Sequence, residues 1–188
     1  SIWSTSYIKR ERRNDARPVT FVFNGGPGSA SAWLHIGLLG PKVVRVPSRA
    51  DRDDGAPPYS LADNDQSIFG ETDLVFVDSI GTGYSRPIGA ATNEDFWSLN
   101  GDTSSMTAFI REWVTANQRW NSPKYILGLS FGTTRAAAVS RALLDGGQDM
   151  ALNGLILISQ ALDFTGSTSQ PSNLLGYVTY LPSVAATA

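Results

Sequence analysis

Short apolar runs that end at turn-forming residues recur along the chain and predict buried strands. Each run is rich in Val, Ile, Leu and Phe, and stops at Asn, Asp, Gly or Ser. Such runs are typical of strands that are covered on both faces of a parallel sheet. The predicted strands are residues 19–23, 74–77, 125–127 and 155–158, with a further stretch of strand character at residues 2–9.

Two longer segments carry apolar side chains at helical spacing. The first is predicted as a helix over residues 103–120, with Asp102 as its N-cap. The residues that fall at helical spacing on it are Met106, Phe109, Ile110, Trp113, Val114 and Asn117. The second helix is predicted over residues 133–144 and is closed by an Asp-Gly-Gly turn. Because strands and helices alternate at these distances, the pattern predicts parallel βαβ units in a doubly wound α/β sheet with helices on both faces.

The segments between these elements are polar and aperiodic. Residues 49–58 are acidic and rich in proline, which predicts a surface loop. Basic residues gather at 9–17, interpreted as the solvated tip of a hairpin. Asp78 follows a strand and is interpreted as a turn former.

Composition narrows the class of protein. A chain of 188 residues that is 41% hydrophobic can form one domain with a substantial core. Its net charge of −2 gives no basic field for nucleic acid, and no apolar run is long enough to span a bilayer. With no cysteine and His35 as the single histidine, disulfides, thiol nucleophiles and cysteine-based zinc sites are excluded within these residues. We expect no metal and no cofactor.

The stretch GLSFG places Ser130 between two glycines, directly after a predicted strand and before a predicted helix. This setting is the signature of a nucleophile on a tight strand-to-helix turn. The glycines avoid collisions with neighbouring backbone, and the helix N-terminus favours developing negative charge. Composition alone would give roughly 0.2 such pentapeptides in this chain, so the prediction depends on the elements around Ser130. The alternative is a glycine-rich helix start without chemistry.

A second glycine-rich turn, NGGPG at residues 24–28, follows the first buried strand. Acyl-transfer enzymes hold an oxyanion with two N–H donors, one after the nucleophile and one from a loop after an earlier strand. Glycines in that loop let a substrate carbonyl approach the backbone. The turn lacks the Lys-Ser/Thr ending of a phosphate-binding loop, and the Gly-Thr-Gly turn at residues 81–83 lacks the acidic partner of a dinucleotide site.

Four segments resemble the serine carboxypeptidases in order and spacing: FVFNGGPGSASAWLHIGLLGP, DLVFVDSIGTGYSR, YILGLSFG and LILISQALDF. That family comprises α/β-hydrolase-fold peptidases that remove C-terminal residues. The resemblance runs from about Pro18 to Ala188, and Ser29, where many members have cysteine, makes the chain more similar to the bacterial branch. The resemblance implies that Ser130 is the nucleophile and that the N–H groups of Gly26 and Phe131 form the oxyanion hole.

The resemblance also implies that the Asn24 side chain and the Gly25 N–H bind the C-terminal carboxylate of the substrate, with Tyr84 in the substrate pocket. Two positions depart from the family pattern. Leu129 stands where the family has a Glu before the nucleophile, and Leu38 where many members carry its partner Glu. Leucine cannot hydrogen-bond a carboxylate, so we expect weaker carboxylate recognition and a reduced preference for acidic pH. The alternative is that Leu129 only packs.

The histidine base of a catalytic triad is not evident. The fold orders its triad Ser, Asp/Glu, His, whereas His35 precedes Ser130 and is interpreted first as structural or substrate-facing, and only secondarily as the base. Asp163 follows a strand and is a candidate to orient a base, although the family places its Asp and His further on, after a helical cap. The chain also opens without Met. We interpret it as the N-terminal portion of an α/β-hydrolase core (1–180) with the start of a cap (181–188), inactive alone.

The sequence thus predicts a serine carboxypeptidase that releases C-terminal residues through an acyl-enzyme on Ser130. Its partner would be a peptide with a free C-terminus. One alternative is an esterase or acyltransferase of the same fold, which the two leucines favour. Another is an inactive peptide-binding homologue, which the missing Asp and His favour. The resemblance implies an extracellular or periplasmic location, and the oligomeric state stays open.

Overall fold

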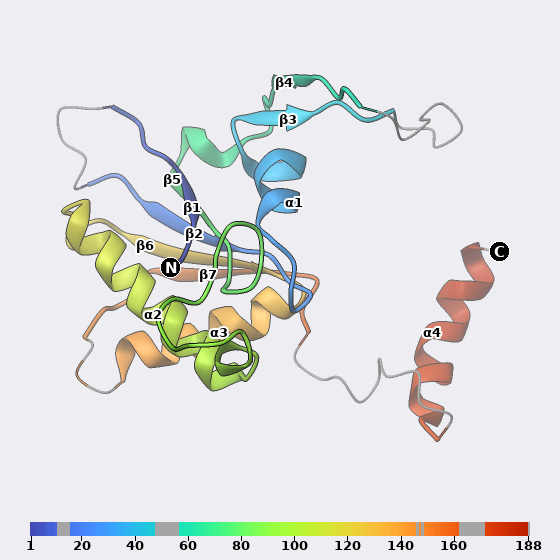
Figure 1. The fold of residues 1–188 in the computed structure, drawn as a ribbon. Helices are drawn as coiled ribbons and strands as arrows, with labels where there is room; N and C mark the ends of the chain where they lie inside the picture. Colours follow the sequence, from blue (N-terminus) through green and yellow to red (C-terminus); the bar gives the residue numbers. More distant parts are fainter. Residues whose placement is uncertain (11–15, 48–56, 146, 148, 162–171, 188) are drawn as a thin grey trace.

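A five-stranded, mostly parallel sheet forms the centre of the computed structural model (Figure 1). The structure describes residues 1–10, 16–47, 57–145, 147, 149–161 and 172–187. The strand order is β1-β5-β2-β6-β7, with β1 antiparallel to β5 and the other pairs parallel. The strands are β1 (Ser4–Tyr7), β2 (Val19–Phe23), β5 (Asp73–Val77), β6 (Lys124–Leu129) and β7 (Gly154–Ile158).

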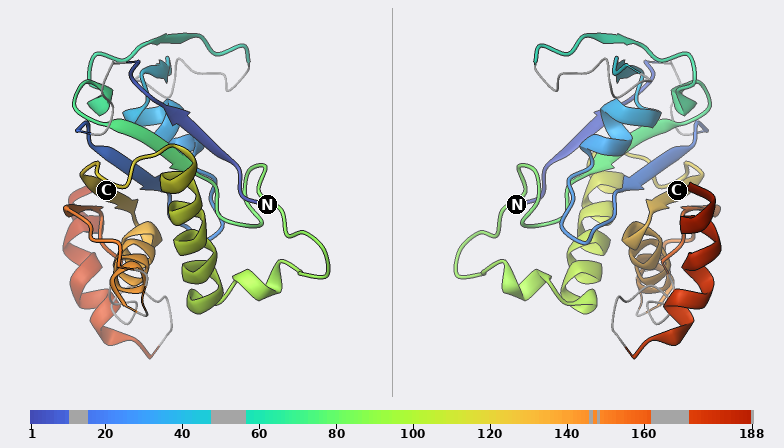
Figure 2. Two further views of the ribbon diagram at one scale, coloured as in Figure 1. Left: turned by 90° about the vertical axis from the view of Figure 1, so that its left-hand side faces the viewer. Right: turned by 90° about the vertical axis from the view of Figure 1, so that its right-hand side faces the viewer.

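Helices cover both faces of this sheet. Helices α2 (Leu99–Ala116) and α3 (Phe131–Leu144) lie on one face, and the short α1 (Ala32–Leu34) with its π-helical continuation η1 (His35–Leu39) lies on the other (Figures 1 and 2). Every residue of β2 and β5 is buried, and their apolar side chains are divided between two clusters, one on each face of the sheet. Phe21 packs toward α2 and α3, whereas Val22 packs with Leu34 of α1. Burial on both faces explains why these strands appear as unbroken apolar runs.

The remaining elements are small or lie at the periphery. Strands β3 (Lys42–Val44) and β4 (Leu61–Asp63) pair antiparallel, and η3 (Ile68–Gly70) and η4 (Glu94–Phe96) are single 3₁₀ turns. Helix α4 (Leu174–Thr187) stands away from the sheet and has no buried residue (Figure 1). None of the described helices is both long and apolar enough to cross a membrane.

The predicted order of strands and helices is confirmed, but both boundaries of the helix predicted at 103–120 are wrong, since α2 ends at Ala116. Helix α2 begins at Leu99 rather than Thr103, because the hydroxyl of Ser98 accepts a hydrogen bond from Gly101 N–H at 3.0 Å and caps the helix there. Asp102 is therefore inside the first turn instead of capping it. Helix α4 runs across the predicted boundary between residues 180 and 181, so the domain division stays a prediction. Most of the predicted surface loop at residues 49–58 lies outside the described residues.

A buried carboxylate, Asp73, ties together the amino ends of the central strands. Its Oδ1 accepts hydrogen bonds from Arg17 Nε at 2.8 Å and from Lys9 N–H at 3.0 Å, and its Oδ2 accepts one from Arg119 Nη1 at 2.5 Å. Asp73 is fully buried and both arginine side chains are nearly so. The prediction of a solvated hairpin tip is therefore wrong for Arg17, which belongs to an internal ion-pair network.

Replacing Asp73 by Asn should lower the free energy of unfolding by about 3–5 kcal/mol, because it leaves two buried guanidinium groups without their counter-charge. Chemical denaturation followed by circular dichroism measures the change. Asp63→Asn is the matched control, since Asp63 pairs with Lys42 in an exposed ion pair and should be replaceable without a measurable effect. Equal stability of the two variants would contradict a structural role for the network.

Candidate active site

Ser130 occupies the sharp turn between β6 and α3. Its backbone has φ 56° and ψ −124°, a conformation that a non-glycine residue seldom adopts. Two contacts hold the turn: Ser130 N–H donates to Ile158 O of β7 at 3.0 Å, and Ser130 O accepts from Thr133 N–H at 2.9 Å. Strained backbone that its surroundings enforce is characteristic of nucleophile elbows. No hydrogen bond to the Ser130 hydroxyl occurs among the described residues.

The two glycines around Ser130 are required by close backbone contacts. A Cβ added to Gly128 would lie 2.1 Å from Gly132 O, and one added to Gly132 would lie 2.6 Å from Phe23 O. Neither position can take a side chain unless the backbone moves. The Gly-x-Ser-x-Gly pattern therefore has a steric cause in this fold.

The NGGPG turn lies directly against the elbow. A Cβ on Gly25 would be 2.7 Å from Ser130 Cβ and 3.0 Å from Phe131 N. Gly26 has φ +112°, which favours glycine. Among the described residues, neither the Gly26 N–H nor the Phe131 N–H has an acceptor. Two free donors close to a serine hydroxyl match the chemistry of an oxyanion hole, and that role stays a prediction.

The carboxylate of Asp78 anchors the segment that follows this turn. Its Oδ1 accepts from the N–H and the hydroxyl of Ser31, both at 2.8 Å, and its Oδ2 accepts from Tyr84 N–H at 3.4 Å. The Asp78 backbone carbonyl also accepts from the Ser85 hydroxyl at 2.8 Å. Asp78 thus connects the glycine-rich turn to the loop after β5, a larger role than the turn former that the sequence indicated.

Asn24 lies at the base of the glycine-rich turn. Its backbone carbonyl accepts from Arg135 Nη1 at 3.0 Å, and its side-chain Oδ1 is buried without a partner. A buried polar atom without a partner is exceptional in folded proteins. The amide is thus available to a ligand, and its predicted contact with a substrate carboxylate stays a prediction, as does that of the adjacent Gly25.

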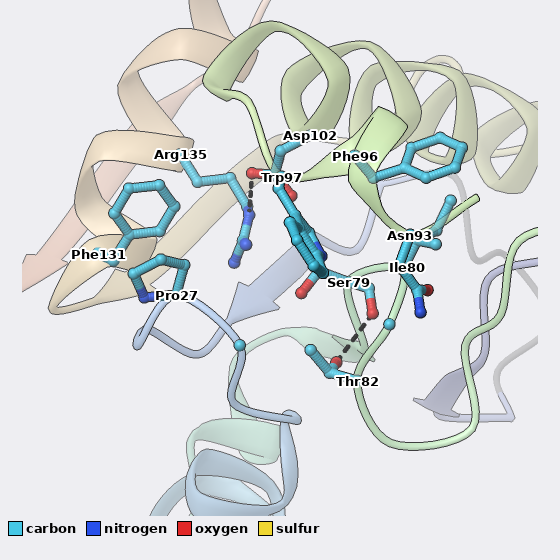
Figure 3. Close-up of a pocket in the computed structure, with 12 residues that line it drawn as sticks. Pro27, Ser79, Ile80, Thr82, Asn93, Phe96, Trp97, Asp102, Phe131 and Arg135 are labelled. Atoms are coloured by element: carbon cyan, nitrogen blue, oxygen red, sulfur yellow. Dashed lines mark hydrogen bonds and ion pairs between the residues drawn. The ribbon is translucent and has the colours of Figure 1, made fainter. Parts of the chain in front are cut away.

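A cavity of about 330 Å³ opens beside Phe131 and the glycine-rich turn (Figure 3). Its walls come from the turn itself, the loop after β5, the segment before α2, and the first turns of α2 and α3. The lining residues are Pro27, Gly28, Ser79, Ile80, Gly81, Thr82, Asn93, Phe96, Trp97, Asp102, Phe131 and Arg135. The sequence predicted the NGGPG turn and Phe131 as parts of the site. It did not predict that Trp97, Asp102 or Arg135 would line a cavity there. The signal available for Arg135 was a charged side chain directly before the three alanines of the predicted helix.

None of the five predicted substrate-binding residues belongs to this lining. Asn24 and Gly25 belong to the glycine-rich turn, and the other three come from other segments. Tyr84 is 77% exposed and packs against Trp3, with ring centroids 5.4 Å apart. Leu38 is 49% exposed, whereas Leu129 packs against the apolar cluster on the α1 face. The packing of Leu129 fits the alternative of a purely structural side chain. The substrate-binding roles of all three residues stay predictions.

His35 is committed to a different set of contacts. Its Nε2 is hydrogen-bonded to the Tyr7 hydroxyl at 2.7 Å, and its ring stacks on Phe76 with centroids 4.7 Å apart. Burial lowers the pKa of His35, although the nearby Asp78 carboxylate opposes that shift. Burial also raises the pKa of Tyr7, which keeps its hydroxyl protonated. These contacts favour the structural interpretation of His35 over the base.

No group of three or more His, Cys, Asp or Glu side chains in the described ranges is placed to hold a metal ion.

His35 should make the protein less stable at mildly acidic pH. Because its pKa in the folded state is lower than the ordinary value of 6.5, protonation favours the unfolded chain. Its contribution to the free energy of unfolding is complete above pH 6.5 and is lost as the pH falls through the lowered pKa. Urea midpoints measured from pH 7.5 to 5.5 should fall in the native protein and fall less in His35→Gln. Parallel curves for the two proteins would contradict the assignment.

The family model for serine carboxypeptidases matches residues 6–183 of the chain. A prohormone-processing carboxypeptidase from Saccharomyces cerevisiae has a similar structure, with a TM-score of 0.70 at 19% identity, and the match covers 99% of this chain and 38% of that chain. A proline iminopeptidase from Mycobacterium smegmatis gives a TM-score of 0.50 at 15% identity, with 99% and 52% covered. A peroxisomal alpha-beta-hydrolase from Saccharomyces cerevisiae gives 0.51 at 15% identity, with 85% and 37% covered. No curated protein matches the chain.

These structural likenesses confirm the α/β-hydrolase fold. The chain spans 38% of the length of the yeast carboxypeptidase, so its own activity is a separate question. The family itself is settled by a match to nearly every residue: this chain belongs to the serine carboxypeptidase family.

Proposed function

We propose that this chain is the nucleophile-bearing part of a serine carboxypeptidase. One observation carries the proposal: the strained elbow holds Ser130 against the glycine-rich turn, so close that a Cβ on Gly25 would lie 2.7 Å from Ser130 Cβ. The N–H groups of Gly26, next to Gly25, and of Phe131, next to Ser130, donate to no acceptor among the described residues. Family membership supports the reaction class.

In the proposed reaction, Ser130 Oγ attacks the carbonyl carbon of the C-terminal peptide bond and loses its proton to a histidine base. The resulting oxyanion accepts hydrogen bonds from the N–H groups of Gly26 and Phe131. The protonated base then donates to the leaving amine, which releases the C-terminal residue and leaves an acyl-enzyme on Ser130. Water attacks this ester by the reverse proton transfers and frees the shortened peptide.

The base and its orienting carboxylate are proposed to come from outside residues 1–188. His35 is bound to Tyr7 and stacked on Phe76, and it is the only histidine in the sequence. Asp163, the other candidate from this chain, lies outside the described residues. Reading the gene beyond the codon for Ala188 tests this directly: a strand-end Asp followed by a His is expected. A frame without that pair would make triad hydrolysis untenable and favour the peptide-binding homologue.

The substrate is proposed to be a peptide with a free C-terminus, bound through Asn24 and Gly25. Asn24 supports this through its side-chain NH2, which donates to no acceptor among the described residues. The buried Oδ1 is itself an acceptor and would need a donor from the ligand instead. An extracellular or periplasmic location is part of the same proposal and follows from family membership alone.

An esterase or acyltransferase is the second candidate, favoured by Leu38 and Leu129. The half-exposed Leu38 and the packed Leu129 offer no hydrogen bond to a carboxylate. A series of esters and peptides with one acyl group, with and without an alcohol acceptor, separates the two activities.

Ser130→Ala and Gly25→Ala should both abolish or strongly reduce hydrolysis by the full-length protein. Loss of the nucleophile lowers kcat by roughly 10⁶-fold in comparable serine proteases. The new methyl of Gly25→Ala would lie 2.5 Å from Leu129 O, so it should displace the turn and lower kcat by about 10²–10³-fold, the effect of one lost oxyanion donor. Gly37→Ala is the matched control, because its Cβ meets open space.

Two results would contradict the roles proposed here. Native activity in a folded Gly25→Ala protein would remove the turn from the active site. Turnover by residues 1–188 alone that disappears in Ser130→Ala would place the complete machinery within this chain.

The two leucines should weaken selectivity for a free C-terminal carboxylate. Each missing hydrogen bond to that charge is worth about 1.5–3 kcal/mol, so kcat/KM should differ little between free-acid and amidated peptides and show no strong acid optimum. Leu129→Glu should raise the preference for free acids as the pH falls, since only a protonated Glu can donate. Leu129→Met is the size-matched control. A strict free-acid preference with an acid optimum in the native protein would contradict this prediction.

A further inference from the structure

The cavity beside Phe131 has a floor made of a buried ion pair. Arg135 Nε donates to Asp102 Oδ2 at 2.6 Å, and Arg135 Nη1 donates to Asn24 O at 3.0 Å. Only 4% of the Arg135 side chain and 9% of the Asp102 side chain are exposed. In Figure 3 the guanidinium points into the space between Pro27 and Trp97.

Two polar atoms of this pair have no partner among the described residues. Within the part of the chain that the structure describes, Arg135 Nη2 donates to no acceptor and Asp102 Oδ1 accepts from no donor. The fully buried side-chain atoms without a partner are Asn24 Oδ1 and Thr107 Oγ1 among those residues. Arg135 Nη2 and Asp102 Oδ1 are not among these fully buried atoms, so both keep some accessible surface. Because both side chains line the cavity, we place that surface on the cavity side. The floor offers one donor and one acceptor.

The charge of this floor selects among ligands. Arg135 and Asp102 neutralise each other, so a carboxylate that approached Nη2 would also meet the Asp102 charge. A cation that approached Oδ1 would meet the guanidinium. A charged ligand thus loses its hydration without gaining an uncompensated partner. A neutral group that both accepts and donates a hydrogen bond satisfies both atoms.

The walls are largely aromatic. Phe131 and Pro27 lie on one side of the guanidinium and Trp97 on the other, while the ring of Phe96 points away from it (Figure 3). Phe96 and Ile80 also belong to the lining. Aromatic rings prefer offset or edge contacts with another ring. A volume of about 330 Å³ is at the small end of ligand pockets and suits one side chain.

We infer that this cavity is a specificity subsite for a tyrosine side chain of the substrate. The phenol ring packs between the aromatic walls, and its hydroxyl accepts from Arg135 Nη2 while it donates to Asp102 Oδ1. The inference rests on the proposed function for its place in the reaction. Phe131 provides both a wall and an oxyanion N–H, whereas Asn24 and Gly25 lie outside the lining. The tyrosine is therefore the residue on the acyl side of the scissile bond.

The test is a comparison of ligands that differ only in the side chain. N-acetyl-tyrosinamide should bind at least about tenfold more tightly than N-acetyl-phenylalaninamide, because the latter leaves both floor atoms unsatisfied. Titrations of the ¹⁵N-labelled chain, followed at the Trp97 indole signal, give both affinities. The signal is assigned by its loss in Trp97→Phe. The corresponding glutamate, lysine and glutamine amides should bind more weakly than the tyrosine ligand.

Variants test whether the preference for the tyrosine ligand comes from the Arg135–Asp102 pair. Arg135→Lys keeps the positive charge beside Asp102 but removes Nη2, so the ratio of the tyrosine to the phenylalanine affinity should fall toward one. Trp97→Ala should weaken both ligands and leave the ratio unchanged. Trp120→Ala is the control, since Trp120 is also exposed but lies beyond the far end of α2. If Arg135→Lys fails to fold, the ligand comparison in the native chain still decides.

Equal affinity for the tyrosine and phenylalanine ligands would overturn the inference. So would tighter binding of the glutamate, lysine or glutamine ligand, or no perturbation of Trp97. Binding does not require an activated Ser130, so it is measured in Ser130→Ala as well. Tyrosine selectivity without turnover by the full-length protein would contradict the proposed function alone, and turnover without tyrosine selectivity would contradict this inference alone.

Discussion

The close approach of two glycine-rich turns at one edge of the sheet is the contact on which the site depends. Strands β2 and β6 are parallel neighbours with Phe23 opposite Gly128, so the two strands leave the sheet at the same level. The turn after β2 then meets the elbow after β6 backbone to backbone, with no room for a Cβ at Gly25 or Gly132. A side chain at either position would push the candidate oxyanion donors away from Ser130. The proposed chemistry therefore depends on the absence of a side chain at Gly25 and at Gly132.

Buried carboxylates fix the segments at both ends of the central strands. Asp73 joins Arg17 and Arg119 at the amino ends of the strands, and Asp78 joins Ser31 to the loop after β5 at the opposite ends. Asp102 joins α2 to α3 through Arg135. Each carboxylate accepts from groups that are distant in sequence, so each restricts the relative positions of two segments. Removing one partner of such a pair is costly because a charge is left buried.

The local part of this structure could be predicted from the sequence, and the long-range polar part could not. Strand β2 was predicted to the residue because burial on both faces leaves an unbroken apolar run that ends at Asn24. The start of α2 was missed because Ser98 caps a first turn of mixed polarity. Arg17 stood among basic residues that suggested solvent, while its partner Asp73 lies 56 residues away. Likewise, nothing near Asp102 in sequence indicates Arg135, which only the packing of α2 on α3 brings within 2.6 Å.

The same ion pair changes how substrate selection can be understood in this chain. In the family pattern, carboxyl groups beside the nucleophile read the terminal carboxylate, but here Leu129 is packed in the apolar cluster and Leu38 offers no hydrogen bond from its side chain. Under the proposed function, selectivity would have to come from other polar atoms that reach the site. Arg135 Nη2 and Asp102 Oδ1 are such atoms: they are open to the cavity beside Phe131 and unpartnered within the described residues. Under this proposal, the protein would recognise the neutral side chain on the acyl side of the scissile bond more than the C-terminal carboxylate of the peptide.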